Sequence, residues 1–207
     1  MSNKLRIVLP QWQGGMNPNY RLGAKLLNAL VPESNQTETL EIPISKEEHQ
    51  TNGVVDEEKI LLNQMKTTFD TLTIKNPDKV ITLGGDCSIS EAPFDYLHGK
   101  YPDDFGMIWL DAHPDISNPT TSSHIHEMVV ANLIHKGAKN FNEQVKNPID
   151  PKKVLFAGLK YNDLRPMDNL VKDLNMSYVT PEELKKDSSP VLDWIKNNNI
   201  KHIAIHL

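Results

Sequence analysis

The sequence has 207 residues, of which 38% are hydrophobic and 24% are charged, with a formal net charge of −5 and a pI of about 5.9. This size and composition predict one globular α/β domain over residues 1–207, with a sizeable core. The acidic balance argues against a nucleic-acid partner. No stretch approaches the roughly 20 apolar residues of a membrane helix, so no membrane partner is expected either.

The chain contains a single cysteine, Cys87, which rules out a disulfide within these residues and favours a reducing compartment. The N-terminal apolar run is short and is broken by Pro10, unlike a signal peptide. We therefore expect a cytoplasmic protein.

Short apolar segments predict strands, and longer patterned segments between them predict helices. The strands are expected at residues 5–9, 39–44, 79–83, 105–110, 153–159, 176–179 and 201–207. The helices are expected at 19–30, 55–74, 88–98, 125–136, 166–174 and 181–198, and polar loops at 45–54, 116–124 and 140–152. This alternation predicts a three-layer, doubly wound, mainly parallel sheet with helices on both faces.

The segment WLDAHPD, residues 109–115, places polar side chains at the end of a buried strand. Asp111, His113 and Asp115 occupy alternate positions, so in an extended chain they share one face at a spacing of roughly 6.6 Å. Such side chains can surround two metal ions about 3.5–4 Å apart. Carboxylate and imidazole ligands favour Mn, Mg, Fe or Zn. Alone, the pattern is equally compatible with solvated charges that cap a strand.

Two neighbouring segments favour the functional interpretation. ITLGGDCSIS, residues 81–90, ends a second apolar strand, and the carboxyl ends of parallel strands meet at one crevice. A hydroxyl-rich segment, residues 117–134, then carries His124 and His126 near the start of a predicted helix. There the helix dipole disfavours the cationic imidazole, which suits His126 to proton exchange at neutral pH. His124 is expected to be an exposed loop residue.

Together, GGDCS (84–88) and DAHPD (111–115) resemble motifs of the ureohydrolase family, which includes arginase, agmatinase and formimidoylglutamase. The resemblance implies an arginase-like fold and hydrolysis of a guanidino or formimino C–N bond by a hydroxide bound to two Mn²⁺ ions. It also implies that Asp111 bridges both ions and that His113 and Asp115 each bind one. His126 is then the residue that transfers protons.

The resemblance also bears on the substrate and on assembly. Ser117 falls where arginases have an asparagine that helps to hold the amino-acid end of the substrate, which argues against arginine as the substrate. A small guanidino or formimino compound is the expected partner, and a homo-oligomer is possible within the family.

Two departures from the family pattern affect the metals. Cys87 replaces a histidine ligand, and its soft sulfur suits manganese poorly. It is either a weak ligand that selects zinc or iron, or a position without metal, and we favour the second. The family's last aspartate motif would follow residue 207. Without it, Asp111 and Asp115 supply −2 against the +4 of two ions, and uncompensated buried charge is costly.

These departures lead to an expectation for the chain as given. We expect an arginase-like domain that is incomplete at its C-terminus, binds manganese weakly or singly, and turns over negligibly. The alternative is a non-catalytic relative of the arginase fold that acts as a ligand-binding or assembly module.

Overall fold

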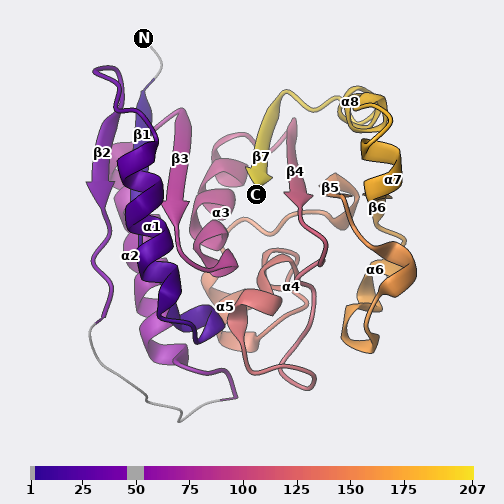
Figure 1. Ribbon diagram of the computed structural model, residues 1–207, viewed down its shortest axis with the longest axis horizontal. Helices are drawn as coiled ribbons and strands as arrows, with labels where there is room; N and C mark the ends of the chain where they lie inside the picture. The colour runs from indigo at the N-terminus through magenta and orange to yellow at the C-terminus, as the bar shows by residue number, and fades with distance from the viewer. Residues whose placement is uncertain (1–2, 46–53) are drawn as a thin grey trace.

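The computed structural model describes residues 3–45 and 54–207, so most of the predicted loop at 45–54 lies outside the described residues. Within the described residues the strands form two parallel sheets, in the orders β2-β1-β3 and β6-β5-β4-β7. Figure 1 shows the arrowheads of β2, β3, β4 and β7 at one common edge. The strands are β1 (Lys4–Leu9), β2 (Glu38–Glu41), β3 (Lys79–Gly84), β4 (Phe105–Leu110), β5 (Val154–Ala157), β6 (Ser177–Val179) and β7 (His202–His206).

Helices lie on both faces of these sheets, which confirms the predicted fold class. The α-helices are α1 (Asn19–Leu30), α2 (Glu58–Lys75), α3 (Glu91–Lys100), α4 (Val129–Leu133), α5 (Lys139–Gln144), α6 (Leu170–Asp173), α7 (Pro181–Leu184) and α8 (Ser189–Asn197). The 3-10 turns are η1 (Gln13–Gly15), η2 (Cys87–Ser90), η3 (Ile125–Glu127), η4 (Pro151–Lys153), η5 (Tyr161–Asp163) and η6 (Pro166–Asp168). Every described helix is too short or too polar to cross a lipid bilayer.

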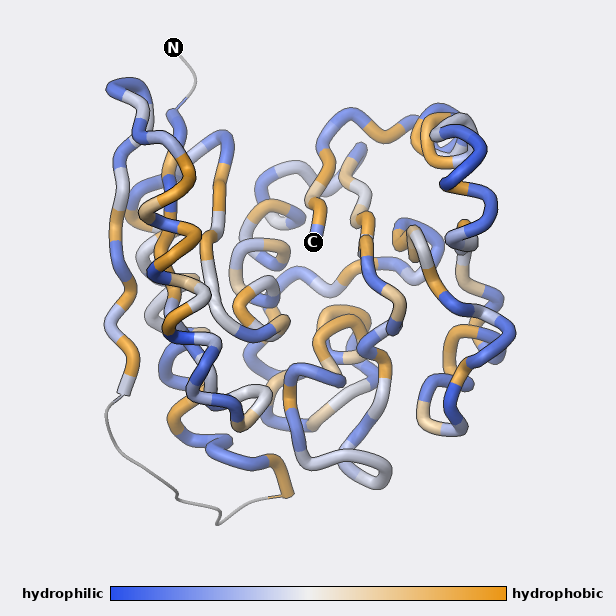
Figure 2. Tube along the Cα trace, in the orientation of Figure 1, coloured by the Kyte–Doolittle hydropathy of each residue, from blue (hydrophilic) through white to orange (hydrophobic). Residues whose placement is uncertain are grey.

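Strand β4 is the centre of the larger core, and its two faces are both covered. Met107 and Trp109 pack into the main hydrophobic cluster, together with the four apolar residues of α4. Ile108 points to the opposite face, where Trp194 of α8 covers it. Figure 2 shows α4 as a largely apolar segment below the strand ends. Burial on both faces explains why this strand is apolar throughout.

Two predicted helices are shorter than the sequence pattern indicates. The helix predicted at 181–198 is two helices, because Pro190 would disrupt the interior of a continuous one. The first begins with a capping box between Thr180 and Glu183, as the sequence predicts. The predicted 125–136 helix is only η3 and α4, and a left-handed residue, His135 (φ 58°), follows it. Conversely, the predicted loop at 140–152 contains most of α5.

The sequence pattern predicts one sheet, but the described strands form two, and the edges of β3 and β7 that face each other are unpaired. Among the described strands, β3 pairs only with β1, and β7 pairs only with β4. Residues of both strands line two cavities of about 500 and 530 Å³. Exposed isoleucines stand at these edges, among them Ile81 on β3 and Ile205 on β7. The first of the cavities contains the polar residues described next.

Candidate functional site

The GGDCS segment turns sharply after β3 and lies against the loop that follows β1. A Cβ atom at Gly85 would lie 1.6 Å from the carbonyl oxygen of Gln11, so only glycine fits there. The buried Asp86 carboxylate accepts hydrogen bonds from the backbone N–H of Gly14 and of Ser88, both at 3.0 Å, and from the Ser88 hydroxyl. Burial raises the pKa of Asp86 more than these hydrogen bonds lower it. The turn therefore holds Cys87 in a fixed position.

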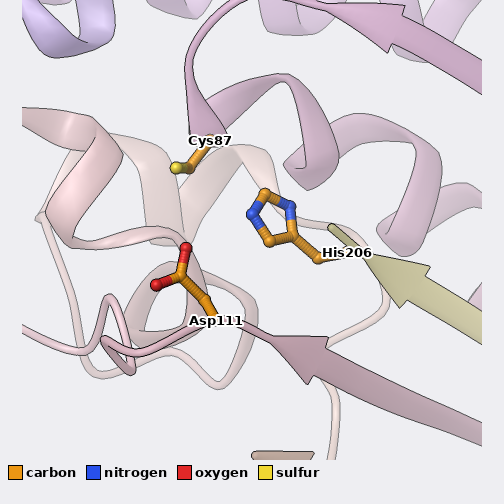
Figure 3. A group of neighbouring side chains, drawn as sticks. All are labelled: Cys87, Asp111 and His206. Atoms are coloured by element: carbon orange, nitrogen blue, oxygen red, sulfur yellow. The ribbon is translucent and has the colours of Figure 1, made fainter. Parts of the chain in front are cut away.

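Three side chains from separate elements meet beyond the strand ends. They are Cys87 at the start of η2, Asp111 directly after β4, and His206 at the end of β7. Their nearest ligand atoms all lie within 4.8 Å of one another, and they point toward a common space in Figure 3. All three line the cavity of about 500 Å³. A thiol, a carboxylate and an imidazole are thus placed for joint binding of a cation.

The Asp111–Asp115 segment is not extended, which corrects the geometry inferred from alternate spacing. Strand β4 ends at Leu110, and Asp111 Oδ1 accepts a hydrogen bond from the backbone N–H of His113 at 2.8 Å, as in an Asx turn. Asp115 adopts a left-handed backbone (φ 43°). The three side chains therefore do not share a strand face. His113 has a mostly exposed side chain, with Nδ1 3.6 Å from Asp111 Oδ1.

Asp115 is the most unusual carboxylate of the site. It is only 5% exposed, and its Oδ2 atom has no hydrogen-bond partner. Burial, followed by the negative charge of Asp111, raises its pKa well above the usual range, although a hydrogen bond with Cys87 opposes this. Burial, followed by the charges of Asp115, Asp86 and Asp111, raises the pKa of the Cys87 thiol. An unpaired buried carboxylate is costly, and a proton or a cation would relieve that cost.

His206 is held on two sides. Its ring stacks on Trp109 with centroids 3.6 Å apart and planes 6° from parallel. Its Nδ1 atom lies 2.9 Å from the Ser90 hydroxyl oxygen. Burial lowers the pKa of His206 to about 4, so the imidazole is neutral at pH 7 and one ring nitrogen offers a lone pair.

His126 lies in η3, which packs against η2. Burial lowers its pKa, and Asp86 and Glu127 only partly compensate. A lowered pKa agrees with the expectation from the sequence. Its main cause is burial and not the helix dipole, since a three-residue turn has little dipole. A neutral half-buried imidazole can accept a proton near neutral pH.

Ser117 is fully buried, and its hydroxyl donates a hydrogen bond to the carbonyl oxygen of Glu127 at 2.8 Å. Its role toward a substrate stays a prediction, because the hydroxyl is already engaged.

Sequence reasoning missed two residues near this site. His206 falls at an alternate position near the end of the last predicted strand, so extending the strand-end argument to that strand would have found it. Burial raises the pKa of Tyr20 of α1, and so do the nearby Cys87, Asp86 and Asp115, which places this phenol close to the site. No motif marks Tyr20, because it comes from the start of a distant helix.

The described donors do not fit a pair of manganese ions. Asp111 and Asp115 supply −2 against +4, and the further donors near Asp111 are the Cys87 sulfur and the imidazoles of His206 and His113. Sulfur is too soft to be a good manganese ligand. The orphaned Asp115 oxygen nevertheless indicates that the interior beside Cys87 can accommodate positive charge.

Comparisons with known proteins place this site in context. The sequence model of the Arginase family matches residues 19–207. The chain is similar to an arginase of Staphylococcus aureus (strain MRSA252), at 25% identity over 190 residues that cover 88% of this chain and 63% of that protein. The chain thus spans about 63% of the length of this curated relative.

Two solved structures share the fold. An Entamoeba histolytica arginase in complex with L-ornithine has a TM-score of 0.86 at 20% identity and covers 99% of this chain and 76% of its own. A Bacillus subtilis formimidoylglutamase has a TM-score of 0.70 at 16% identity and covers 99% of this chain and 64% of its own. Since the family model matches nearly the whole sequence, the chain belongs to the arginase family.

Proposed function

We propose that the whole protein hydrolyses a linear guanidino or formimino C–N bond in a small substrate. The observation that carries this proposal is the convergence of the GGDCS segment and Asp111, the first residue of DAHPD, on one cavity, in a chain of the arginase family. A small polar substrate is consistent with a cavity of about 500 Å³. The activity belongs to the whole protein, because the chain spans only part of the length of its relatives.

In this reaction, water adds to the trigonal carbon, the C–N bond breaks, and the departing amine takes up a proton. Urea is the second product of a guanidino substrate, and formamide is that of a formimino substrate. The arginase family is generally manganese-dependent, and a formiminoglutamase of Trypanosoma cruzi is described with Mn²⁺. Because the described donors do not fit a manganese pair, only proton transfer is assigned to this chain.

His126 is the proposed proton carrier. Its lowered pKa leaves the imidazole neutral at pH 7, so that it can take a proton from water and deliver it to the leaving amine. Asp111, His113 and Asp115 remain the proposed metal ligands of the full-length protein. Ser117 remains a proposed substrate contact, which argues against arginine.

The test is an activity panel on the full-length protein with added manganese, in which urea, formamide and amine release are measured. Arginine, agmatine, guanidinobutyrate and formimidoylglutamate represent the two bond types. We expect turnover of at least one, and His126→Asn should lower kcat by about 10²–10⁴-fold. Absence of product from the whole panel would overturn the proposal.

A second candidate is a non-catalytic relative that binds a ligand or supports assembly, which the Cys87 substitution favours. Elemental analysis separates the two, because near two metals per full-length chain favours the enzyme and fewer favours the relative. For the 207-residue chain alone, we expect negligible turnover. A cytoplasmic location and a homo-oligomer remain proposals, the first supported by the single cysteine.

A further inference from the structure

We propose that Cys87, Asp111 and His206 bind a single zinc ion in this chain, with Asp115 beside it as a further carboxylate. The three donor types, S, O and N, are the ones that zinc combines in proteins. The proposal concerns binding alone and does not rest on the proposed hydrolysis.

The spacing of the donors suits one tetrahedral ion. Zinc–ligand distances of about 2.0–2.3 Å put neighbouring ligand atoms roughly 3.3–3.8 Å apart. In the structure these atoms lie within 4.8 Å of one another, so a closure of about 1 Å would complete the coordination. The donors come from the η2 turn, from the end of the central strand β4, and from the end of β7, which pairs with β4, so the backbone positions all three.

Asp115 supplies a second and independent indication of a cation. The residue is 95% buried, and its Oδ2 atom lacks any hydrogen-bond partner. Its carboxylate lies within hydrogen-bonding reach of the Cys87 thiol and in the electrostatic field of Asp111. A proton or a cation between them would relieve the cost of burying this carboxylate beside a second carboxylate and a thiol.

The imidazole of His206 is oriented as a metal ligand would be. Its Nδ1 atom is engaged by Ser90, which is itself part of η2 together with Cys87. Figure 3 shows the other ring nitrogen directed toward Cys87 and Asp111. Hydrogen bonding of the second nitrogen, with the ring stacked on Trp109, fixes both the tautomer and the direction of the lone pair.

Charge and softness favour one zinc over manganese. A thiolate and the Asp111 carboxylate together neutralise a single divalent ion. Sulfur binds zinc well and manganese poorly, and affinity for divalent ions rises from manganese to zinc at such a site. The cysteine that weakens the manganese assignment therefore becomes a ligand in its own right.

The experiment titrates the metal-free 207-residue protein with Co²⁺ as a spectroscopic probe and then displaces it with Zn²⁺. We expect one equivalent of cobalt with a thiolate charge-transfer band and tetrahedral visible bands, and full displacement by one equivalent of zinc. Cys87→Ser should remove the charge-transfer band. His206→Gln should weaken zinc binding by at least about 100-fold.

His202→Gln is the matched control, since His202 is on the same strand and is also stacked on an aromatic ring. It should bind zinc like the unchanged protein. Binding that is unaffected by His206→Gln, or two tight manganese sites, would overturn the proposal.

A second readout does not depend on how well the variants fold. Cys87 is the only cysteine, so its alkylation can be followed in the unchanged protein by mass spectrometry. One equivalent of zinc should slow alkylation of the folded protein at least tenfold, whereas manganese should not. Equal alkylation rates with and without zinc would refute the role of Cys87. Failure of the hydrolysis panel would leave these results unaffected.

Discussion

Each end of β7 carries a histidine that stacks on an aromatic ring, but the two histidines differ in burial and in their polar partners. His202 stacks on Tyr101 with centroids 3.7 Å apart, and His206 stacks on Trp109 with centroids 3.6 Å apart. His202 is partly exposed, and its Nδ1 lies 2.5 Å from Asp104 Oδ1. His206 is buried beside a thiol and a carboxylate.

The difference shows that position along a parallel strand decides what a histidine does. His202 lies at the amino end, where its contact with Asp104 holds β7 to the start of β4. His206 lies at the carboxyl end, where loops from several strands meet and leave an unfilled space. The same residue type is a structural anchor at one end and a candidate ligand at the other.

The largest expected difference between the two ends of β7 is the loss of stability when the aromatic ring under each histidine is removed. Trp109→Ala removes a fully buried ring from under His206 and should lower the free energy of unfolding by about 3–5 kcal/mol. Tyr101→Ala, at the partly exposed end, should cost about 1 kcal/mol. Urea denaturation of both variants measures the comparison, and equal losses would contradict it.

The pH dependence of stability should sharpen the contrast. The folded pKa of His206 is lowered to about 4 from 6.5, so the unfolded chain binds more protons between these values. The neutral His206 therefore contributes roughly 3 kcal/mol to the free energy of unfolding above pH 6.5. This contribution is lost as the pH falls to about 4. His206→Gln should flatten this part of the curve of unfolding free energy against pH, and His202→Gln should not. Identical curves for both variants would argue against it.

Metal preference should respond to the thiol. Cys87→His exchanges a soft ligand for a harder one, and should raise the affinity for manganese relative to zinc by about tenfold, or ~1.4 kcal/mol. Competition titrations of the two ions measure this ratio. A matched His98→Gln change, whose imidazole bonds the carbonyl of Asn147, should leave the ratio unchanged.

The smallest effect is expected at the amino end of β7. The hydrogen bond from His202 lowers the pKa of Asp104, so this pair stabilises the fold above pH 3.8 and the contribution is lost as pH falls further. His202→Gln should make the melting temperature less sensitive to pH in that acidic range. Thermal unfolding at successive pH values tests this prediction, and an unchanged slope would count against a role of the His202–Asp104 hydrogen bond.

The sheet strands could be predicted well because their apolar runs reflect burial on both faces. The β4 boundaries match the predicted 105–110 segment, and α1 matches 19–30. Helix lengths were harder, since Pro190 and the left-handed His135 interrupt patterns that look continuous. Turns and helix breaks depend on single residues, whereas hydrophobic periodicity is judged over a window of many residues and does not detect them.

The candidate site could be located from the sequence, but its geometry could not. The ends of β3 and β4 were identified, and Cys87 and Asp111 do meet there. The Asx turn at Asp111 separates His113 from them, and strand periodicity cannot foresee such a turn. His206 reaches the group through the pairing of β7 with β4, a contact between distant parts of the chain.

The unpaired edges of β3 and β7 have a consequence for amide hydrogen exchange. In a strand with a single neighbour, every second N–H points away from that neighbour, so no strand hydrogen bond protects it from exchange. Deuterium should therefore enter β7 in an alternating pattern, while β4 exchanges slowly along its whole length. A segment that bound to the unpaired edge of β7 would protect these amides, and the alternating exchange pattern would disappear.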